Sequence, residues 1–414
     1  LLLVVGDVPY GAHHVRAVLL ADRMEFPADP TTPSGALLAR IRPEIRAQKA
    51  YTVATDTDGL AKLDQNESPY DLPAALKREI VDAALEHAWN RYPQDRPRQL
   101  TATLAAHLGL TPEHLIVGHG SNELTHTLGL CFLREGTPVV LPHPMFSLYE
   151  AVARMHGADI VSVDPQPDLT HAPDTIISAA QRADAALTVV TTPSNPTGKA
   201  LAYADLARIA RSVPGMLVVD EAYHEFVDGQ TAIDLLEAHP NVLVMRTFSK
   251  AMGLAGLRLG YLAGHPRLVH ELQKSRLPFV VDHLAEAAGL AVLARPDLIA
   301  ERVTALKEGY AELLAGVRAL GLTAHESAAN FFLVKSPIAP ADLRQQMAKR
   351  GVRIRDVSGY RALPGYVRLS VGMPEENRAC LDALAAVLAA TGQANNQADG
   401  NGTASETVAV SAGS

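Results

Sequence analysis

Short apolar runs alternate with longer amphipathic segments through the middle of the chain. The runs recur at residues 115–117, 138–141, 159–163, 186–191, 216–219, 242–245 and 259–263. Short runs without a polar face are typical of strands that are buried on both sides, and segments such as 201–211 are long enough for crossover helices. The pattern therefore predicts an α/β fold in which helices cover a mainly parallel sheet.

The pattern changes after about residue 295. Amphipathic helical segments at 300–320 and 341–350 are interleaved with short apolar runs at 330–334, 352–355 and 366–371. This mixture predicts a smaller α+β domain, which we expect to recruit the segment around residues 61–66. The predicted organisation is a large domain over residues 76–295, a small C-terminal domain over 296–391, and an N-terminal arm over 38–75 that forms part of the small domain.

Both ends of the chain differ in pattern from the middle. Residues 392–414 are rich in Gly, Asn, Ser, Thr and Ala, and such a segment cannot bury enough apolar surface to offset its ordering entropy. We therefore expect a disordered tail there. We expect residues 1–37 to form an N-terminal extension that is partly disordered. Because the first methionine is Met24, residues 1–23 are expected to precede the natural start or to be foreign to the natural protein.

Composition narrows the class of protein. The 414 residues carry a formal charge of −8 and contain no block of basic residues, so the electrostatic footprint of a nucleic-acid-binding protein is missing from the sequence. No apolar run approaches the roughly 18 residues of a membrane span, and Leu1–Val5 is too short for a secretory signal. Cys131 and Cys380 lack the spacing of a zinc site and are expected to be buried thiols in a reducing compartment, the cytoplasm.

Polar residues follow three of the predicted strands directly. Asn195 comes after the run 186–191, Asp220 after 216–219, and Lys250 after 242–245. Taken singly, Asn195 is explained as a turn residue, Asp220 as a helix cap and Lys250 as a solvated surface lysine. The carboxyl ends of parallel strands, however, meet at the edge where such sheets bind ligands. The three together predict a site at that edge.

An amine, a carboxylate and an arginine are the groups that pyridoxal 5′-phosphate requires. Lysine forms the Schiff base, a strand-end carboxylate such as Asp220 keeps the pyridine nitrogen protonated, and a cation holds the phosphate. Arg258 follows Lys250 by eight residues, beyond two glycines that permit close approach of the backbone to a ligand. The sequence therefore predicts a pyridoxal phosphate site.

Two further segments suit this cofactor. Ser121 and Asn122 follow the glycines of Gly118–Gly120 and open a predicted helix, where exposed amides favour an anion, although an ordinary turn explains the glycines equally well. Phe146 follows another predicted strand and could lie flat on the pyridine ring, whereas plain core packing is its ordinary explanation.

Residues of roughly 38–390 resemble the class I/II members of the fold-type I pyridoxal phosphate-dependent aminotransferases, and among them the histidinol-phosphate aminotransferases. The resemblance lies in seven blocks that occur in the family's order: Leu63–Tyr70, Arg91–Pro93, Gly120–Leu124, Ser194–Gly198, Asp220–Tyr223, Ser249–Lys250 with Gly256–Arg258, and Val367–Gly372.

The resemblance implies a role for each matching residue at the cofactor. Lys250 would form the Schiff base, Asp220 would pair with the pyridinium, and Asn195 and Tyr223 would bond the ring oxygen. Phe146 matches the aromatic residue that stacks on the ring and is usually tyrosine in the family. The remaining implied cofactor contacts, mostly to the phosphate, are Ser121, Asn122, Thr247, Ser249 and Arg258. Tyr92 matches a tyrosine that reaches the cofactor of the other subunit, which implies a homodimer with shared active sites.

The resemblance also implies a substrate. Arg368 matches the arginine that binds an α-carboxylate, and a guanidinium fork suits that planar group. Arg355 matches an arginine that holds the phosphate of histidinol phosphate. Tyr51 and Asn66 match substrate contacts, although Ala50 replaces the usual proline before Tyr51.

The implied reaction is transamination of L-histidinol phosphate with 2-oxoglutarate to imidazole acetol phosphate and glutamate. The same blocks leave three alternatives: an aromatic or broad-specificity aminotransferase, a decarboxylase of phosphorylated amino acids, and a non-catalytic protein of the same fold.

Overall fold

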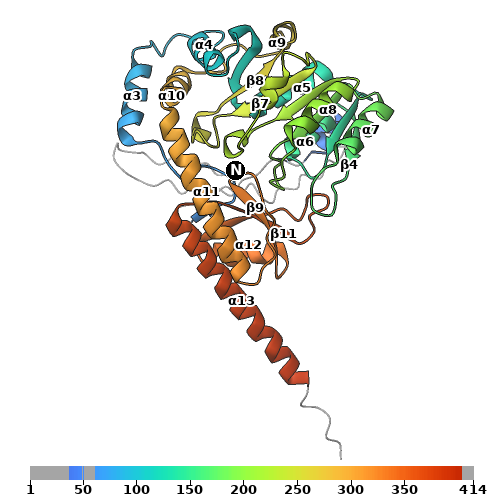
Figure 1. The fold of residues 1–414 in the computed structure, drawn as a ribbon, viewed down its shortest axis with the longest axis vertical. Coiled ribbons are helices and arrows are strands. Elements are labelled where there is room, and N and C mark those ends of the chain that lie inside the picture. The colour runs from blue at the N-terminus through green and yellow to red at the C-terminus, as the bar shows by residue number, and fades with distance from the viewer. Residues whose placement is uncertain (1–36, 49, 51–60, 403–414) are drawn as a thin grey trace, which may run out of the picture. The chain divides into compact units, whose positions relative to one another are not determined.

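A computed structural model describes residues 37–48, 50 and 61–402, with side chains up to residue 390 (Figure 1). Tyr51, most of the predicted N-terminal extension and residues 403–414 lie outside the described residues. The chain divides into two units, Leu1–Lys49 and Ala50–Ser414. In the first, the structure describes the short helix α2 (Pro43–Arg46), which has proline in its first turn and Arg46 in its last.

Within the described residues of the second unit, seven strands form the larger sheet in the order β2-β8-β7-β6-β5-β3-β4. Strands β4, β3, β5, β6 and β7 pair in parallel, and only β8 runs antiparallel to its neighbours β7 and β2. The predicted α/β class with a mainly parallel sheet is therefore confirmed. The strands are β2 (Leu115–His119), β3 (Pro138–Pro142), β4 (Asp159–Val163), β5 (Leu187–Thr191), β6 (Met216–Asp220), β7 (Val242–Thr247) and β8 (Leu259–Gly264).

Helices cover both faces of the larger sheet. In β6, Leu217 and Val219 face one core, and Val218 faces the other. Because neighbouring side chains of a strand point to opposite faces, a sheet covered on both sides requires apolar residues without alternation. One core includes residues of α3 (Ala74–Leu85), α4 (Arg98–His107), α7 (Pro173–Ala183), α8 (Tyr203–Ser212) and α10 (His283–Leu293), and the other those of α5 (Gly120–Phe132), α6 (Ser147–Met155) and α9 (Pro266–Gln273). Short 3₁₀ turns are η2 (Pro112–His114), η3 (His224–Phe226), η4 (Ala232–Leu235) and η5 (Ala255–Leu257).

A smaller sheet of order β1-β10-β11-β9 packs against three helices and has a core of its own. Ala61, Lys62 and Leu63 pair in parallel with Val352–Ile354, so the segment around residue 61 joins this sheet, as the sequence predicts. Helix α11, orange in Figure 1, leads from α10 to this sheet. The elements are β1 (Ala61–Leu63), β9 (Phe331–Lys335), β10 (Val352–Asp356), β11 (Tyr366–Ser370), α11 (Pro296–Ala319), α12 (Pro340–Ala348) and α13 (Pro374–Gly402).

Helix α13 continues to Gly402, beyond residue 391 where the small domain was predicted to end. Its earlier turns are anchored in the core by Cys380, Leu384 and Val387. Once a helix is nucleated, each added residue gains one hydrogen bond without a new nucleation cost. The segment after residue 391 contains no proline that would stop this propagation.

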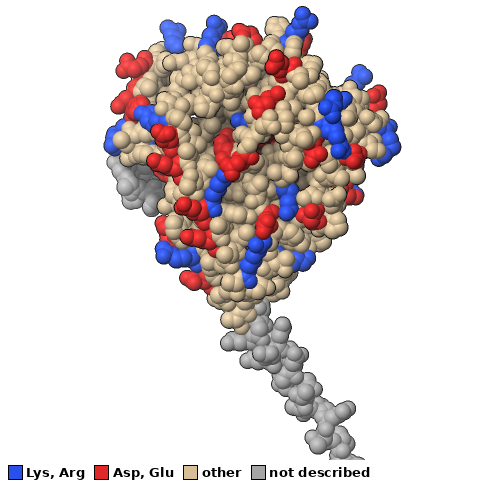
Figure 2. All heavy atoms as spheres, viewed as in Figure 1, with Lys and Arg blue, Asp and Glu red and all other residues tan. Residues whose placement is uncertain are grey.

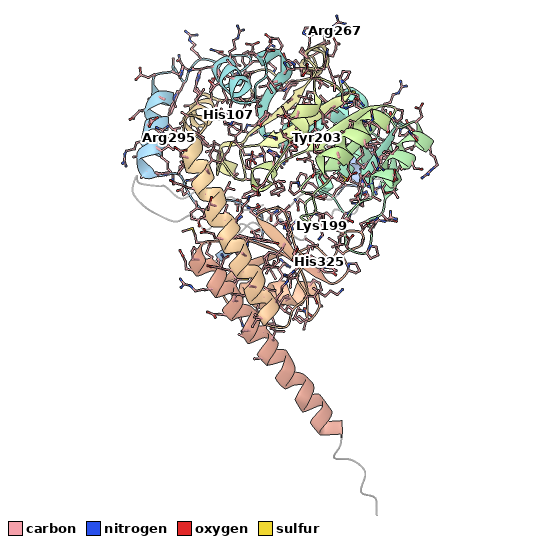
Figure 3. All side chains as sticks on the ribbon, viewed as in Figure 1. His107, Lys199, Tyr203, Arg267, Arg295 and His325 are labelled. Carbon is pink, nitrogen blue, oxygen red and sulfur yellow. The ribbon has the colours of Figure 1, made fainter. Side chains whose placement is uncertain are left out.

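The loop after β5 contacts the smaller domain. The Ala328 amide donates to the Gly198 carbonyl at 2.8 Å, and a Cβ on Gly198, whose φ is +71°, would lie 1.9 Å from Ser327 Oγ. Figure 3 shows Lys199 and His325 close together at this junction. Glycine is therefore required where the two domains meet beside Asn195.

Charged side chains of both signs are interspersed over the face shown in Figure 2. None of the helices in the described part of the chain combines the length and apolar character needed to cross a membrane. Cys380 is buried as predicted, but Cys131 is exposed because it lies on the outer side of α5, where its thiol hydrogen-bonds to the Ser275 hydroxyl.

Candidate active site

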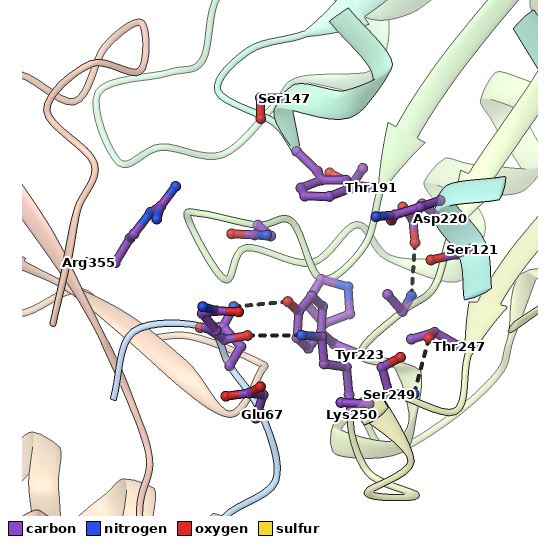
Figure 4. Close-up of a pocket in the computed structure, with 18 of the residues that line it drawn as sticks. Glu67, Ser121, Ser147, Thr191, Asp220, Tyr223, Thr247, Ser249, Lys250 and Arg355 are labelled. Atoms are coloured by element: carbon purple, nitrogen blue, oxygen red, sulfur yellow. Dashed lines mark hydrogen bonds between the residues drawn. The ribbon is translucent and has the colours of Figure 1, made fainter. Parts of the chain in front are cut away.

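A cavity of about 430 Å³ opens at the carboxyl ends of β5, β6 and β7 (Figure 4). This volume lies in the usual range of small-molecule sites. The structure brings together at this cavity every predicted site residue that it describes except Tyr92: Asn66, Ser121, Asn122, Phe146, Asn195, Asp220, Tyr223, Thr247, Ser249, Lys250, Arg258, Arg355 and Arg368.

Lys250 lies on the loop that follows β7, and its Nζ donates to the Gln65 carbonyl at 3.0 Å. Burial lowers the pKa of this amine to about 8, and the nearby cations Arg368, Lys62 and Arg258 act in the same direction, whereas Glu67 opposes them. A larger fraction of the amine is therefore neutral near pH 7 than for an ordinary lysine, as a nucleophile or base requires.

Asp220 ends β6 and is only 8% exposed. Its Oδ1 accepts from the Ala222 amide at 3.0 Å, and its Oδ2 accepts from the Tyr149 hydroxyl at 2.8 Å. Burial raises the pKa of Asp220 to about 6, although both hydrogen bonds act to lower it. The carboxylate is thus fixed at the cavity wall with a strong preference for a cationic partner.

Tyr223 and Asn66 form a buried network with the smaller sheet. The Asn66 Nδ2 donates to the Tyr223 hydroxyl at 2.9 Å, and the Ser370 hydroxyl donates to Asn66 Oδ1 at 2.9 Å. Burial raises the pKa of Tyr223 to about 12, so the phenol keeps its proton at neutral pH. Asn66 has a φ of +54°, a conformation that asparagine tolerates better than most residues.

An anion-binding cradle lies at one end of the cavity. Helix α5 begins at Gly120, so the amides of Ser121 and Asn122 lie in its first turn, where they have no partner within the helix. The Arg258 Nη1 donates to the Ser249 hydroxyl at 3.4 Å. A Cβ on Gly120 would lie 2.6 Å from Arg258 Nη2, so only glycine allows the guanidinium this close to the helix terminus.

These residues fit pyridoxal phosphate. The cradle supplies amides, a hydroxyl and a cation for a phosphate, and Asp220 supplies a buried carboxylate that pairs best with a cationic ring nitrogen. Lys250 provides an amine with a lowered pKa in the same cavity. Phe146 lines the cavity wall as a flat apolar side chain.

Two arginines of the smaller sheet face the cavity from neighbouring strands. Arg355 on β10 and Arg368 on β11 are directly opposite each other in the register. Arg368 donates to Asn195 Oδ1 and, at 2.7 Å, to the Asp64 carbonyl, while its buried Nε has no hydrogen-bond partner. Within the described residues, Arg355 forms no salt bridge. The pair therefore offers guanidinium groups for anions.

One predicted site residue does not reach the cavity of this chain. Tyr92 is 81% exposed and stacks on Phe279, with ring centroids 4.7 Å apart.

Sequence reasoning also missed residues, notably Tyr149 behind Asp220, and Glu67 and Tyr360 at the cavity. Tyr149 lies three residues after Phe146, but its apolar helical spacing is the same as that of a core residue, so the sequence carries no separate signal for it.

Comparisons with known proteins agree with this geometry. Residues 58–384 match the family described as aminotransferase class I and II. The chain is 38% identical over 355 residues to a protein named histidinol-phosphate aminotransferase from Chlorobium phaeovibrioides, covering 85% of this chain and 98% of that one. It is 36% identical over 345 residues to the protein of the same name from Chlorobaculum tepidum, covering 83% and 99%.

A solved structure shares the fold as well. The histidinol-phosphate aminotransferase from Sinorhizobium meliloti in complex with pyridoxal-5′-phosphate superposes with a TM-score of 0.77 at 26% identity, over 85% of this chain and 98% of that one. The predicted fold class, enzyme class and cofactor are confirmed. The chain belongs to the class I and II aminotransferases, and its cofactor is pyridoxal 5′-phosphate.

Proposed function

We propose that this enzyme transfers the amino group of L-histidinol phosphate to 2-oxoglutarate, giving imidazole acetol phosphate and glutamate. The observation that carries the proposal is the pair Arg355 and Arg368, which line one cavity with Lys250. The donor carries a phosphate and the acceptor two carboxylates, so both substrates need cationic groups besides those that hold the cofactor. The names of the relatives support the same donor.

The cofactor contacts follow from the cavity. We assign the phosphate to Ser121, Asn122, Thr247, Ser249 and Arg258, in the cradle at the start of α5. When bound, pyridoxal phosphate supplies an electron sink for the electrons of the donor's α C–H bond.

The other cofactor contacts surround the ring. Asp220 would hold the proton on the ring nitrogen, and Asn195 and Tyr223 would donate to the ring oxygen. Phe146 would pack on the ring face and exclude water from it.

Proton movement is assigned to Lys250. Its neutral Nζ takes the α-proton from the donor and returns a proton later in the same half-reaction, since its pKa of about 8 suits both directions near neutral pH. Arg368, held by Asn195 and the Asp64 carbonyl, orients the carboxylate of glutamate or 2-oxoglutarate. Arg355 binds the donor's phosphate or the acceptor's second carboxylate, and Asn66 contacts the substrate beside them.

We further propose a cytoplasmic homodimer with shared active sites. Tyr92, Trp89 and Leu277 are 81%, 72% and 73% exposed, and a second copy would cover this apolar surface. In that arrangement Tyr92 reaches the cofactor of the partner subunit. Cys131 and Cys380 are both free thiols, which suits a reducing compartment. A sedimentation coefficient of a monomer at micromolar concentration would contradict the dimer.

The test of the substrate is a half-reaction. Histidinol phosphate is added to the cofactor-loaded enzyme without a keto acid, and the visible spectrum of the cofactor is followed. Fast conversion to the amine form, with phenylalanine far slower, is expected; faster conversion with phenylalanine would assign the enzyme to the aromatic or broad-specificity group. Release of carbon dioxide from a phosphorylated amino acid would identify a decarboxylase instead.

Arg355→Ala tests the phosphate assignment. It should slow the half-reaction with histidinol phosphate more than that with glutamate, because the phosphate loses a charge-assisted hydrogen bond. Arg350→Ala removes an exposed arginine that precedes β10 and lies outside the cavity, and it serves as the matched control. Equal losses with both donors would contradict the phosphate role of Arg355.

A further inference from the structure

Asp220 has a second, hidden partner behind the cavity wall. Tyr149 on α6 is 5% exposed, does not line the cavity, and donates its hydroxyl proton to Asp220 Oδ2 at 2.8 Å. The other carboxylate oxygen accepts from the Ala222 amide. Two donors from different elements therefore fix the plane of the carboxylate, and Asp220 lines the cavity (Figure 4).

We propose that Tyr149 is a positioning residue, which holds the Asp220 carboxylate ionised and oriented toward the cofactor's ring nitrogen. The inference rests on the proposed pairing of Asp220 with that nitrogen. Because a phenylalanine would fill the same space in the core, the hydroxyl of Tyr149 is the part that this role requires.

The electrostatic surroundings explain why a donor is needed. Burial raises the pKa of Asp220 and favours a neutral acid, which would leave the ring nitrogen without a counter-ion. The Tyr149 hydrogen bond, the Ala222 amide and the Lys250 cation lower that pKa, whereas the neighbouring Glu221 raises it. Tyr223 is also close enough for its own pKa to respond to Asp220.

Tyr149 is suited to donate at every relevant pH. Burial and the adjacent Asp220 raise the pKa of its phenol well above the ordinary value. The hydroxyl therefore keeps its proton throughout the working range, and the hydrogen bond always favours the charged form of the carboxylate.

The first test is Tyr149→Phe in the holoenzyme loaded with ¹⁵N-labelled pyridoxal phosphate. The ring-nitrogen resonance should move toward the value of unprotonated pyridine, because the more basic carboxylate draws the proton from the ring. Tyr310→Phe is the matched control, since it removes a half-buried tyrosine hydroxyl, the acceptor of the Ser327 amide, and Tyr310 does not line the cavity. A ring-nitrogen resonance that is unchanged in Tyr149→Phe, or shifted equally by Tyr310→Phe, would overturn the inference.

The second test is a double-mutant cycle on the cofactor's dissociation constant. Tyr149→Phe should raise this constant about tenfold in the parent, the effect of losing one hydrogen bond to a charged group, and less than about twofold in Asp220→Asn. Equal losses in both backgrounds would show that Tyr149 does not act through the carboxylate. If Asp220→Asn on its own leaves the cofactor's dissociation constant unchanged, the proposed pairing of Asp220 with the ring nitrogen is wrong. If Asp220→Asn raises the constant and Tyr149→Phe leaves it unchanged, the pairing of Asp220 stands and the positioning role of Tyr149 is wrong.

Discussion

A buried ion pair anchors the two strand ends that carry Asp220 and Lys250. Arg246 on β7 donates through Nε and Nη2 to Glu221 Oε2, at 3.1 and 2.8 Å, and the two side chains are 8% and 3% exposed. Glu221 also accepts from the Ala232 amide at 2.7 Å. Glu221 follows Asp220 directly, and Arg246 lies four residues before Lys250. The Arg246–Glu221 ion pair therefore holds together the two chain segments that carry Asp220 and Lys250.

Arg246→Met should destabilise the protein by about 3–5 kcal/mol, since it removes the guanidinium that hydrogen-bonds to the buried carboxylate of Glu221. The double variant Glu221→Met with Arg246→Met should recover most of that loss, because an apolar pair of similar volume often replaces a buried ion pair without cost. The expected coupling between the two positions is therefore large and stabilising.

Urea unfolding of the cofactor-loaded variants, followed by far-UV circular dichroism, measures these differences. Lys274→Met serves as the control, because it breaks the exposed Lys274–Glu271 pair and should cost less than about 0.5 kcal/mol. A loss below about 1 kcal/mol for Arg246→Met would refute the reasoning. A double variant that loses the sum of the two single losses would refute it as well.

Three further predictions follow from the site. Lys250→Ala should abolish transamination while the circular dichroism spectrum of the fold is retained; normal turnover would remove Lys250 from the mechanism. In protein freed of cofactor, reductive methylation of Lys250 should be half-maximal near pH 8, and Arg368→Gln should move that midpoint upward because a neighbouring cation is lost; a midpoint near 10.5 would contradict the lowered pKa. Gly198→Ala should lower stability by more than about 1 kcal/mol, because its φ is +71° and its Cβ would clash with Ser327; an unchanged melting temperature would contradict this.

The placement of Asn195, Asp220 and Lys250 at one edge of the sheet could be predicted from the sequence, because it depends on how buried parallel strands are built. The runs that end before Asn195, Asp220 and Lys250 are apolar without alternation, which only a sheet covered on both faces requires. Because the carboxyl ends of parallel strands lie at the same edge of a sheet, the residues that follow them come together there. The sequence therefore located the cavity before any side-chain geometry was known.

Other parts of the site could not be predicted from pattern alone. Tyr149 acts from within a helix, where a buried tyrosine that donates to a carboxylate and one that only packs have the same spacing. The contact between Arg368 and Asn195 joins residues 173 positions apart in two domains, and no local rule gives such a pairing. Helix α13 continued past residue 391 because its anchor lies earlier in the chain, outside the window whose composition suggested disorder.

Arg368 connects the energetics of the fold with the choice of substrate. Burial lowers the pKa of its guanidinium, and its Nε has no hydrogen-bond partner, so the cation is held in the core at a cost. Asn195 and the Asp64 carbonyl offset only part of this cost, because both partners are neutral. A carboxylate that enters the cavity would supply the missing charge, so an anion gains more here than at an exposed arginine. A neutral substrate would leave the guanidinium without a carboxylate partner, so the desolvation of Arg368 favours the binding of anionic substrates over neutral ones.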